Sequence, residues 1–111
     1  FPELFRAYAL MGAEIILLVA EWPRRRIGHW DVLLRARAIE NQCFIAAVNK
    51  VGTSKGEVLG GNSAVINPMG EILAQGEADP GVFMGVVDLR ETAKARKWMP
   101  VFKDRNPDVY S

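Results

Sequence analysis

Two short apolar runs on either side of a long helical segment constrain the fold of this chain more than any other feature. Residues 14–20 (EIILLVA) and 44–49 (FIAAVN) are each too short for a helix of their own and are rich in residue types that fit a strand covered on both faces. Between them, residues 29–42 carry apolar side chains at helical spacing. Because a strand, a helix and a second strand in this order form a right-handed crossover onto a parallel pair, the sequence predicts an α/β fold.

The remaining segments predict an antiparallel extension of that sheet with a helix at each end of the chain. Residues 62–66 and 71–75 flank Asn67-Pro-Met-Gly70, whose proline and glycine suit the turn of a hairpin. The other expected elements are a helix over residues 1–11 ending at Gly12, a flexible loop over 51–61, a third antiparallel strand over 82–87, a helix from Asp88 to Trp98 and an extended tail over 99–111. The sheet is therefore expected to be mixed, and no linker divides the chain.

Composition and charge exclude several classes of partner. Half of the 111 residues are hydrophobic and 24% are charged, which is a globular balance rather than a disordered one. The net charge of +1 argues against a protein that binds nucleic acid by covering phosphates. The longest apolar run, residues 15–20, is far shorter than the ~20 residues that cross a bilayer. The single cysteine fits a reducing compartment, so we expect a cytoplasmic protein with no nucleic-acid or membrane partner.

Few residues could carry chemistry by themselves. One His and one Cys do not make the cluster of ligands that zinc needs, and the glycine-rich residues 56–61 lack the Gly-Lys-Ser/Thr of a phosphate loop, so no metal or cofactor is expected. Cys43 lies at the end of the predicted helix, where the dipole disfavours a thiolate, which favours a buried packing role over a nucleophile. His29, at the start of that helix, is expected to pack or to hydrogen-bond rather than to catalyse.

The segment after the first predicted strand has the composition of a loop that could border a ligand. Ligands of α/β proteins collect at the carboxyl ends of parallel strands, so Trp22 and Pro23 are placed either to line a pocket or to pack on the surface. Arg24, Arg25 and Arg26 could grip a carboxylate or a partner, although a basic run is more often solvated. The residues thus supply parts of a pocket and no complete catalytic set.

Seven motifs occur in an order that resembles the nitrilase, or carbon-nitrogen hydrolase, superfamily, and in particular its omega-amidase branch. They are Phe1-Pro-Glu-Leu-Phe-Arg6, Ala20-Glu-Trp-Pro23, Arg35-Ala-Arg-Ala-Ile-Glu-Asn-Gln42, Val48-Asn-Lys-Val-Gly52, Gly61-Asn-Ser63, Asn67-Pro-Met-Gly-Glu71 and Pro100-Val-Phe-Lys-Asp-Arg105. The resemblance extends over essentially the whole chain. It implies that residues 1–111 form the C-terminal half of an αββα sandwich whose complete form hydrolyses a small-molecule amide with water.

The resemblance also implies a cysteine nucleophile, a glutamate base and a lysine that act through a thioester. These three residues would lie upstream of Phe1, so no catalytic residue is expected in this chain, and Cys43 does not match the position of the nucleophile. The chain alone is therefore expected to be inactive. The alternative is an inactive fragment or degenerate relative that serves as a structural or assembly module.

Residue by residue, the resemblance implies two sets of positions. The first set borders the substrate: Glu21, Trp22, Pro23, Asn62 and Ser63. The second set lies at the contact of a homodimer or larger homo-oligomer: Phe5, Tyr8, Trp30, Leu34, Arg37, Val101 and Phe102.

Overall fold

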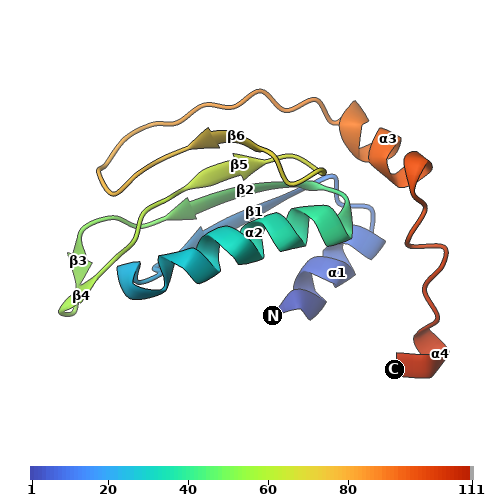
Figure 1. The fold of residues 1–111 in the computed structure, drawn as a ribbon, viewed down its shortest axis with the longest axis horizontal. Coiled ribbons are helices and arrows are strands. Elements are labelled where there is room, and N and C mark those ends of the chain that lie inside the picture. Colours follow the sequence, from blue (N-terminus) through green and yellow to red (C-terminus); the bar gives the residue numbers. More distant parts are fainter. Residues whose placement is uncertain (111) are drawn as a thin grey trace.

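A four-stranded mixed sheet forms the centre of the computed structural model, which describes residues 1–110. Its strands, in spatial order, are β1 (Ile15–Ala20), β2 (Phe44–Asn49), β5 (Ala64–Ile66) and β6 (Ile72–Gln75). β1 and β2 are parallel, in register from Ile15 opposite Phe44 to Ala20 opposite Asn49, whereas β5 and β6 are added antiparallel (Figure 1). The predicted α/β class, the mixed sheet and the hairpin are thus confirmed.

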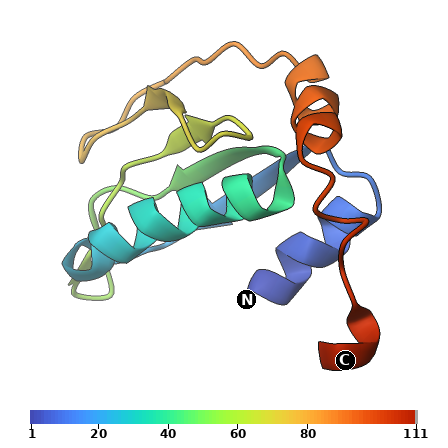
Figure 2. The same ribbon diagram turned by 45° about the vertical axis from the view of Figure 1, so that its right-hand side comes forward.

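Helices surround one side and one end of this sheet. The helical elements are α1 (Pro2–Leu10), the short 3-10 helix η1 (Arg24–Arg26), α2 (Ile27–Asn41), α3 (Arg90–Trp98) and α4 (Pro107–Tyr110). α2 is the predicted crossover helix and begins earlier than expected because η1 leads directly into it. α1 lies beside the far end of α2, and α3 stands at the same end of the sheet (Figure 2).

The core lies between α2 and one face of the sheet. Trp30 and Leu34 of α2 are only 2% and 4% exposed, and Ala38 is fully buried. They pack against Ile16, Ile45, Ala47, Ala64 and Ile66, which the strands present to the same side. Burying a side chain the size of leucine contributes about 1.5–3 kcal/mol, so this layer holds the crossover together.

The opposite face of the sheet is open along β1 and β2. Because successive strand residues point to opposite sides, the neighbours of the core residues, Leu17, Val19 and Val48, point outward and are 76%, 83% and 60% exposed. This open face is apolar, which is typical of a surface that packs against another layer.

Residues 82–87 differ from the expected third strand of the meander. They are extended but pair with no strand, and they lie across the open face instead of beside the edge of β6. Gly85 is so close to this face that an added Cβ would lie 3.4 Å from the side chains of Val65 and Ala74. The apolar residues Val82 and Met84 are exposed on the outer side. The alternation of the sequence correctly predicts an extended segment, but this segment covers the face of the sheet and does not add a strand to its edge.

Two further segments are more ordered than expected. The loop over residues 51–61 contains a small antiparallel hairpin of β3 (Thr53–Ser54) and β4 (Glu57–Val58). The tail is not extended, because a turn over residues 101–104 precedes α4. In the part of the chain that the structure describes, no helix is long and apolar enough to span a membrane.

We expect the open face to make the isolated chain associate with itself. Replacing Leu17, Val19 and Val48 together with lysine should raise the monomer fraction in size-exclusion chromatography and reduce the binding of an apolar fluorescent dye, because it removes exposed apolar area. Val58→Lys, on β4 of the small hairpin, is the control and should change neither measurement. A wild-type chain that is monomeric and binds no dye would contradict this prediction.

Candidate active-site region

The segment that follows β1 lies at the carboxyl ends of the two parallel strands, where the sequence places Glu21, Trp22 and Pro23. The Glu21 carboxylate accepts a hydrogen bond from Nζ of Lys50 at 3.0 Å, and both side chains are at least half exposed, so this ion pair contributes little to stability. Pro23 is buried and forms a β-bridge with Leu59, next to the β3–β4 hairpin. The loop is thus attached to residues that follow β2.

Asn49, the last residue of β2, makes most of this attachment. Its Oδ1 accepts the backbone N–H of Trp22 at 2.6 Å, and its Nδ2 donates to the carbonyls of Trp22 at 3.1 Å and Gly61 at 2.9 Å. The side chain is buried, and these bonds satisfy its amide group in a place where an unpaired polar group would be costly. Asn49 therefore joins the end of β1 to the loop before β5.

Asn62 and Ser63, also predicted near the substrate, lie on that loop but face different sides. The hydroxyl of Ser63 accepts the backbone N–H of Asn49 at 3.0 Å. Asn62 instead faces α2: its carbonyl accepts the indole N–H of Trp30 at 2.9 Å, and its Nδ2 lies 3.3 Å from both carboxylate oxygens of Asp31.

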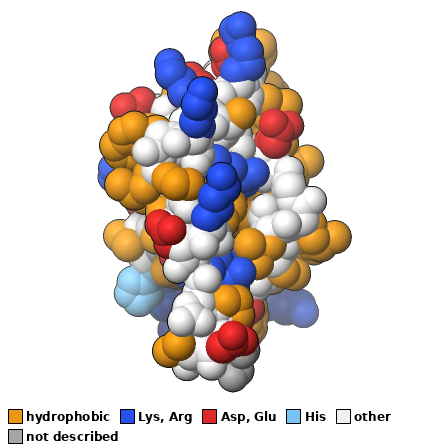
Figure 3. All heavy atoms as spheres, turned by 90° about the vertical axis from the view of Figure 1, so that its right-hand side faces the viewer, with side chains coloured by type: hydrophobic (Ala, Val, Ile, Leu, Met, Phe, Trp, Pro, Cys, Tyr) orange, Lys and Arg blue, Asp and Glu red, His pale blue; other side chains and the backbone are white. Residues whose placement is uncertain are grey.

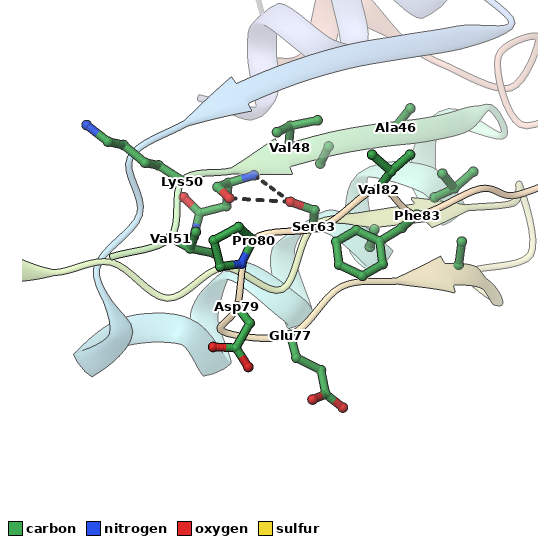
Figure 4. A pocket seen from close by; sticks show the side chains of 16 residues that line it. Ala46, Val48, Lys50, Val51, Ser63, Glu77, Asp79, Pro80, Val82 and Phe83 are labelled. Carbon is green, nitrogen blue, oxygen red and sulfur yellow. Dashed lines mark hydrogen bonds between the residues drawn. The ribbon is translucent and has the colours of Figure 1, made fainter. Parts of the chain in front are cut away.

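A cavity of about 540 Å³ lies beside this junction, between the open sheet face and the segment that follows β6. Ala46, Val48 and Val65 of the sheet form one wall, and Val82 and Phe83 form the other (Figure 4). The Phe83 ring fits where it does because Gly76 and Gly81 have no side chains, since a Cβ at either position would overlap it. Most of the lining is apolar.

Polar groups stand around this cavity. Lys50, Ser63, Glu77 and Asp79 are among the residues that line it, and the Glu77 and Asp79 carboxylates point away from the Lys50 ammonium in Figure 4. No cysteine or histidine belongs to the lining. This arrangement can enclose an apolar group beside a few polar groups, but it contains no pair of nucleophile and base.

The five predicted substrate residues are only partly brought together. Ser63 lines the cavity, Trp22 is joined to it through Asn49, and Glu21 reaches it through Lys50. Pro23 and Asn62 do not line it. Asn49 itself was missed as a site residue, although a polar residue that ends a buried apolar strand at the ligand-binding edge is a usable signal.

The three consecutive arginines are not equivalent. Arg25 donates from Nε to the Glu57 carboxylate at 2.6 Å, an ion pair between largely exposed groups. The guanidinium carbon of Arg26 lies 5.4 Å from the ring centroid of Trp22, and the Trp22 indole donates to the Arg26 carbonyl at 2.7 Å. Arg24 takes part in neither contact.

Cys43 has the position and the chemistry of a packing residue. It is fully buried in the core, and burial raises the pKa of its thiol to about 11 despite the opposing charges of Arg96 and Arg6. At pH 7 such a thiol is ionised in only about one molecule in ten thousand. His29, in contrast, is exposed at the start of α2, so of the two expected roles packing does not hold.

The residues expected at a dimer contact also separate into groups. Trp30 and Leu34 are core residues of this chain and offer almost no surface to a second copy. Tyr8 is exposed on α1, and Phe5 packs under Arg37, whose guanidinium carbon lies 6.0 Å from the ring centroid.

Val101 and Phe102, the tail residues of that set, are half-buried. Phe102 holds the tail, because the guanidinium carbons of Arg6 and Arg96 lie 5.0 and 5.2 Å from its ring centroid. Basic and apolar side chains alternate over this end of the molecule (Figure 3). Val101 lines a second cavity there, of about 870 Å³, between α1, α3 and the tail.

Across residues 1–110, His, Cys, Asp and Glu side chains form no group of three or more that could hold an ion.

Comparison with known proteins gives consistent matches over the length of the chain. The carbon-nitrogen hydrolase family profile matches residues 1–97. The chain is 44% identical over 110 residues to the 2-oxoglutaramate amidase of Bacillus subtilis, which is 99% of this chain and 42% of that protein. It is 38% identical over 112 residues to the deaminated glutathione amidase of Homo sapiens, covering 99% of this chain and 34% of that protein.

A solved structure has the same fold. The NitFhit protein of C. elegans superposes with a TM-score of 0.91 at 34% identity, covering 100% of this chain and 27% of that one. The chain thus spans less than half the length of the relatives it matches. The expected nitrilase-type fold is confirmed, and the chain belongs to the carbon-nitrogen hydrolase family.

Proposed function

We propose that this chain is the scaffold portion of an amidase that hydrolyses a small amide bearing a carboxylate at its other end. The identity to 2-oxoglutaramate amidase over nearly the whole chain carries this proposal. The mainly apolar cavity with polar groups around it suits the short carbon chain of such a substrate.

The catalytic cysteine, glutamate and lysine of the proposed reaction belong upstream of Phe1. In that arrangement the thiolate attacks the amide carbonyl, ammonia leaves, and water cleaves the resulting thioester to release the acid and regenerate the thiol. In this proposal the N-terminus of α1 would follow the cysteine and stabilise its thiolate.

Arg24, Arg25 and Arg26 form what we call the arginine loop, which is proposed to attract the acidic end of the substrate. Arg25 is paired with the Glu57 carboxylate, whereas the contact of Arg26 is with the neutral ring of Trp22, so Arg24 and Arg26 supply most of the uncompensated positive charge of this loop. The charge of this loop is expected to affect substrate binding rather than the chemical step.

We also propose that the protein assembles as a homodimer through α1, the exposed side of α2 and the tail. Trp30 and Leu34 are buried within the chain and are left out of the proposed interface. The other residues implied by the resemblance remain in it: Phe5, Tyr8, Arg37, Val101 and Phe102. The exposed apolar side chains of Tyr8 and Trp98 support an interface at this end.

The position of the nucleophile can be tested with Cys43. In the complete gene product, Cys43→Ala should leave amide hydrolysis within about threefold of wild type, because a thiol with a raised pKa inside the core is no nucleophile. Residues 1–111 alone should show no turnover. Turnover by residues 1–111 that disappears with Cys43→Ala would contradict both the upstream placement and the packing role.

The arginine loop can be tested by charge removal. Replacing Arg24, Arg25 and Arg26 with alanine should raise KM for an acidic amide by about tenfold and leave KM for a neutral ester of similar size unchanged, since only uniform binding of the charged end is lost. Replacing Arg90, Lys94 and Lys97 of α3 removes the same charge elsewhere and is the control. Equal effects on both substrates would refute the role.

The dimer proposal is tested by a charge at its expected centre. Tyr8→Glu should lower the dimer fraction of the complete gene product in analytical ultracentrifugation, because it places a carboxylate in a surface that is proposed to be apolar and buried. Val58→Glu on β4 gives a similar change outside α1, α2 and the tail, and a larger effect there than at Tyr8 would place the contact elsewhere.

A further inference from the structure

We infer that Asn49 is a positioning residue that fixes the Trp22 peptide and the arginine loop beside the substrate cavity. This inference rests on the proposed amidase function and assigns the loop a defined support. We assign its influence on the reaction to its bonds with Trp22 rather than to contact with the reacting atoms.

The geometry shows why this support is needed. The parallel ladder between β1 and β2 ends with Ala20 opposite Asn49, and the next rung is the bond from the Lys50 N–H to the Ala20 carbonyl at 3.0 Å. Beyond that rung, the Asn49 side-chain amide bonds to both the N–H and the carbonyl of Trp22. One side chain thereby imitates a backbone strand partner for the loop.

The same amide ties the loop to the wall of the cavity. Nδ2 of Asn49 donates to Gly61 as well, and the backbone N–H of Gly60 donates to the Trp22 carbonyl at 2.8 Å. The backbone of Asn49 is bonded to the Ser63 hydroxyl, which lines the cavity (Figure 4). A shift of the Trp22 peptide is therefore a shift relative to Ser63.

The arginine loop depends on Trp22 in turn. The Trp22 indole donates to the carbonyl of Arg26, and its ring lies under the Arg26 guanidinium. Release of the Trp22 backbone therefore loosens the two contacts that hold Arg26 and, with it, η1.

A second buried asparagine provides a matched control. Asn67 is also buried, and its Oδ1 accepts the N–H groups of Met69 and Glu71 while its Nδ2 donates to the Glu71 carboxylate at 2.9 Å. It shapes the turn between β5 and β6, does not line the cavity, and makes none of these bonds to the Trp22 loop. A variant at this position loses comparable hydrogen bonds without releasing the loop.

The test compares Asn49→Asp with Asn67→Asp in the complete gene product. Aspartate keeps the size of asparagine but turns the two bonds from Nδ2 to carbonyls into repulsions. We expect Asn49→Asp to raise KM for an acidic amide by at least about tenfold with a smaller change in kcat, and Asn67→Asp to change KM by less than about twofold, at a temperature where both remain folded. Asn49→Ser, which removes the repulsion, should show the same split to a smaller degree and serves if Asn49→Asp does not fold.

A second readout reports on the loop itself. Trypsin cuts after arginine, so cleavage after Arg24, Arg25 and Arg26 should be at least about fivefold faster in the Asn49 variants than in wild type and unchanged in Asn67→Asp, because local opening exposes the loop. Equal KM changes at both positions, or equal cleavage rates, would overturn the assignment of Asn49 while leaving the amidase proposal intact. A wild-type protein that hydrolyses no amide would instead refute the proposed function, and the role of Asn49 in substrate positioning would fall with it.

Discussion

The parallel pairing of β1 with β2 beneath α2 is the constraint on which the rest of the structure depends. Six consecutive residue pairs set the two strands in register, and Trp30, Leu34 and Ala38 of α2 cover one side of them. A shift of one residue would turn every core side chain to the opposite face, so burial by α2 specifies the register strongly. With the register fixed, the ends of both strands lie at one edge, and the loops that follow them meet there.

Because α2 covers only one face of the sheet, polar groups are found at the ends of the strands and apolar side chains are exposed on the face opposite α2. At the strand ends, backbone groups lose their ladder partners and must be satisfied otherwise, which Asn49 and Ser63 accomplish. On the far side, residues 79–83 lie opposite the sheet, and the cavity lies between the two. The position of the candidate site is therefore a consequence of how the crossover is built.

Much of the fold could be predicted from periodicity, because its signals are local. The runs at 14–20 and 44–49, the helix between them and the turn at Asn67-Pro-Met-Gly70 all correspond to observed elements. Residues 82–87 were placed wrongly because alternation shows that a segment is extended but not whether it lies at an edge or across a face. The resemblance implied a partner surface for Trp30 and Leu34, whereas both face the sheet of their own chain, and a motif match does not say which side of a helix each residue occupies. The role of Asn49 cannot be predicted from local sequence because it depends on bonds to Trp22 and Gly61, which are distant in sequence.

The ring of Phe102 between the guanidinium groups of Arg6 and Arg96 links the tail to two helices that are ninety residues apart in the chain. Both arginines also donate to backbone carbonyls, Arg6 to Glu40 and Arg96 to Ala13 and Asn41, so they close the ends of α1 and α2. The Phe102 ring thus contacts both guanidinium groups and joins the tail to both helices. A protease that trims the chain ahead of residue 102 would loosen the junction of the first two helices, although every residue of that junction would remain in place.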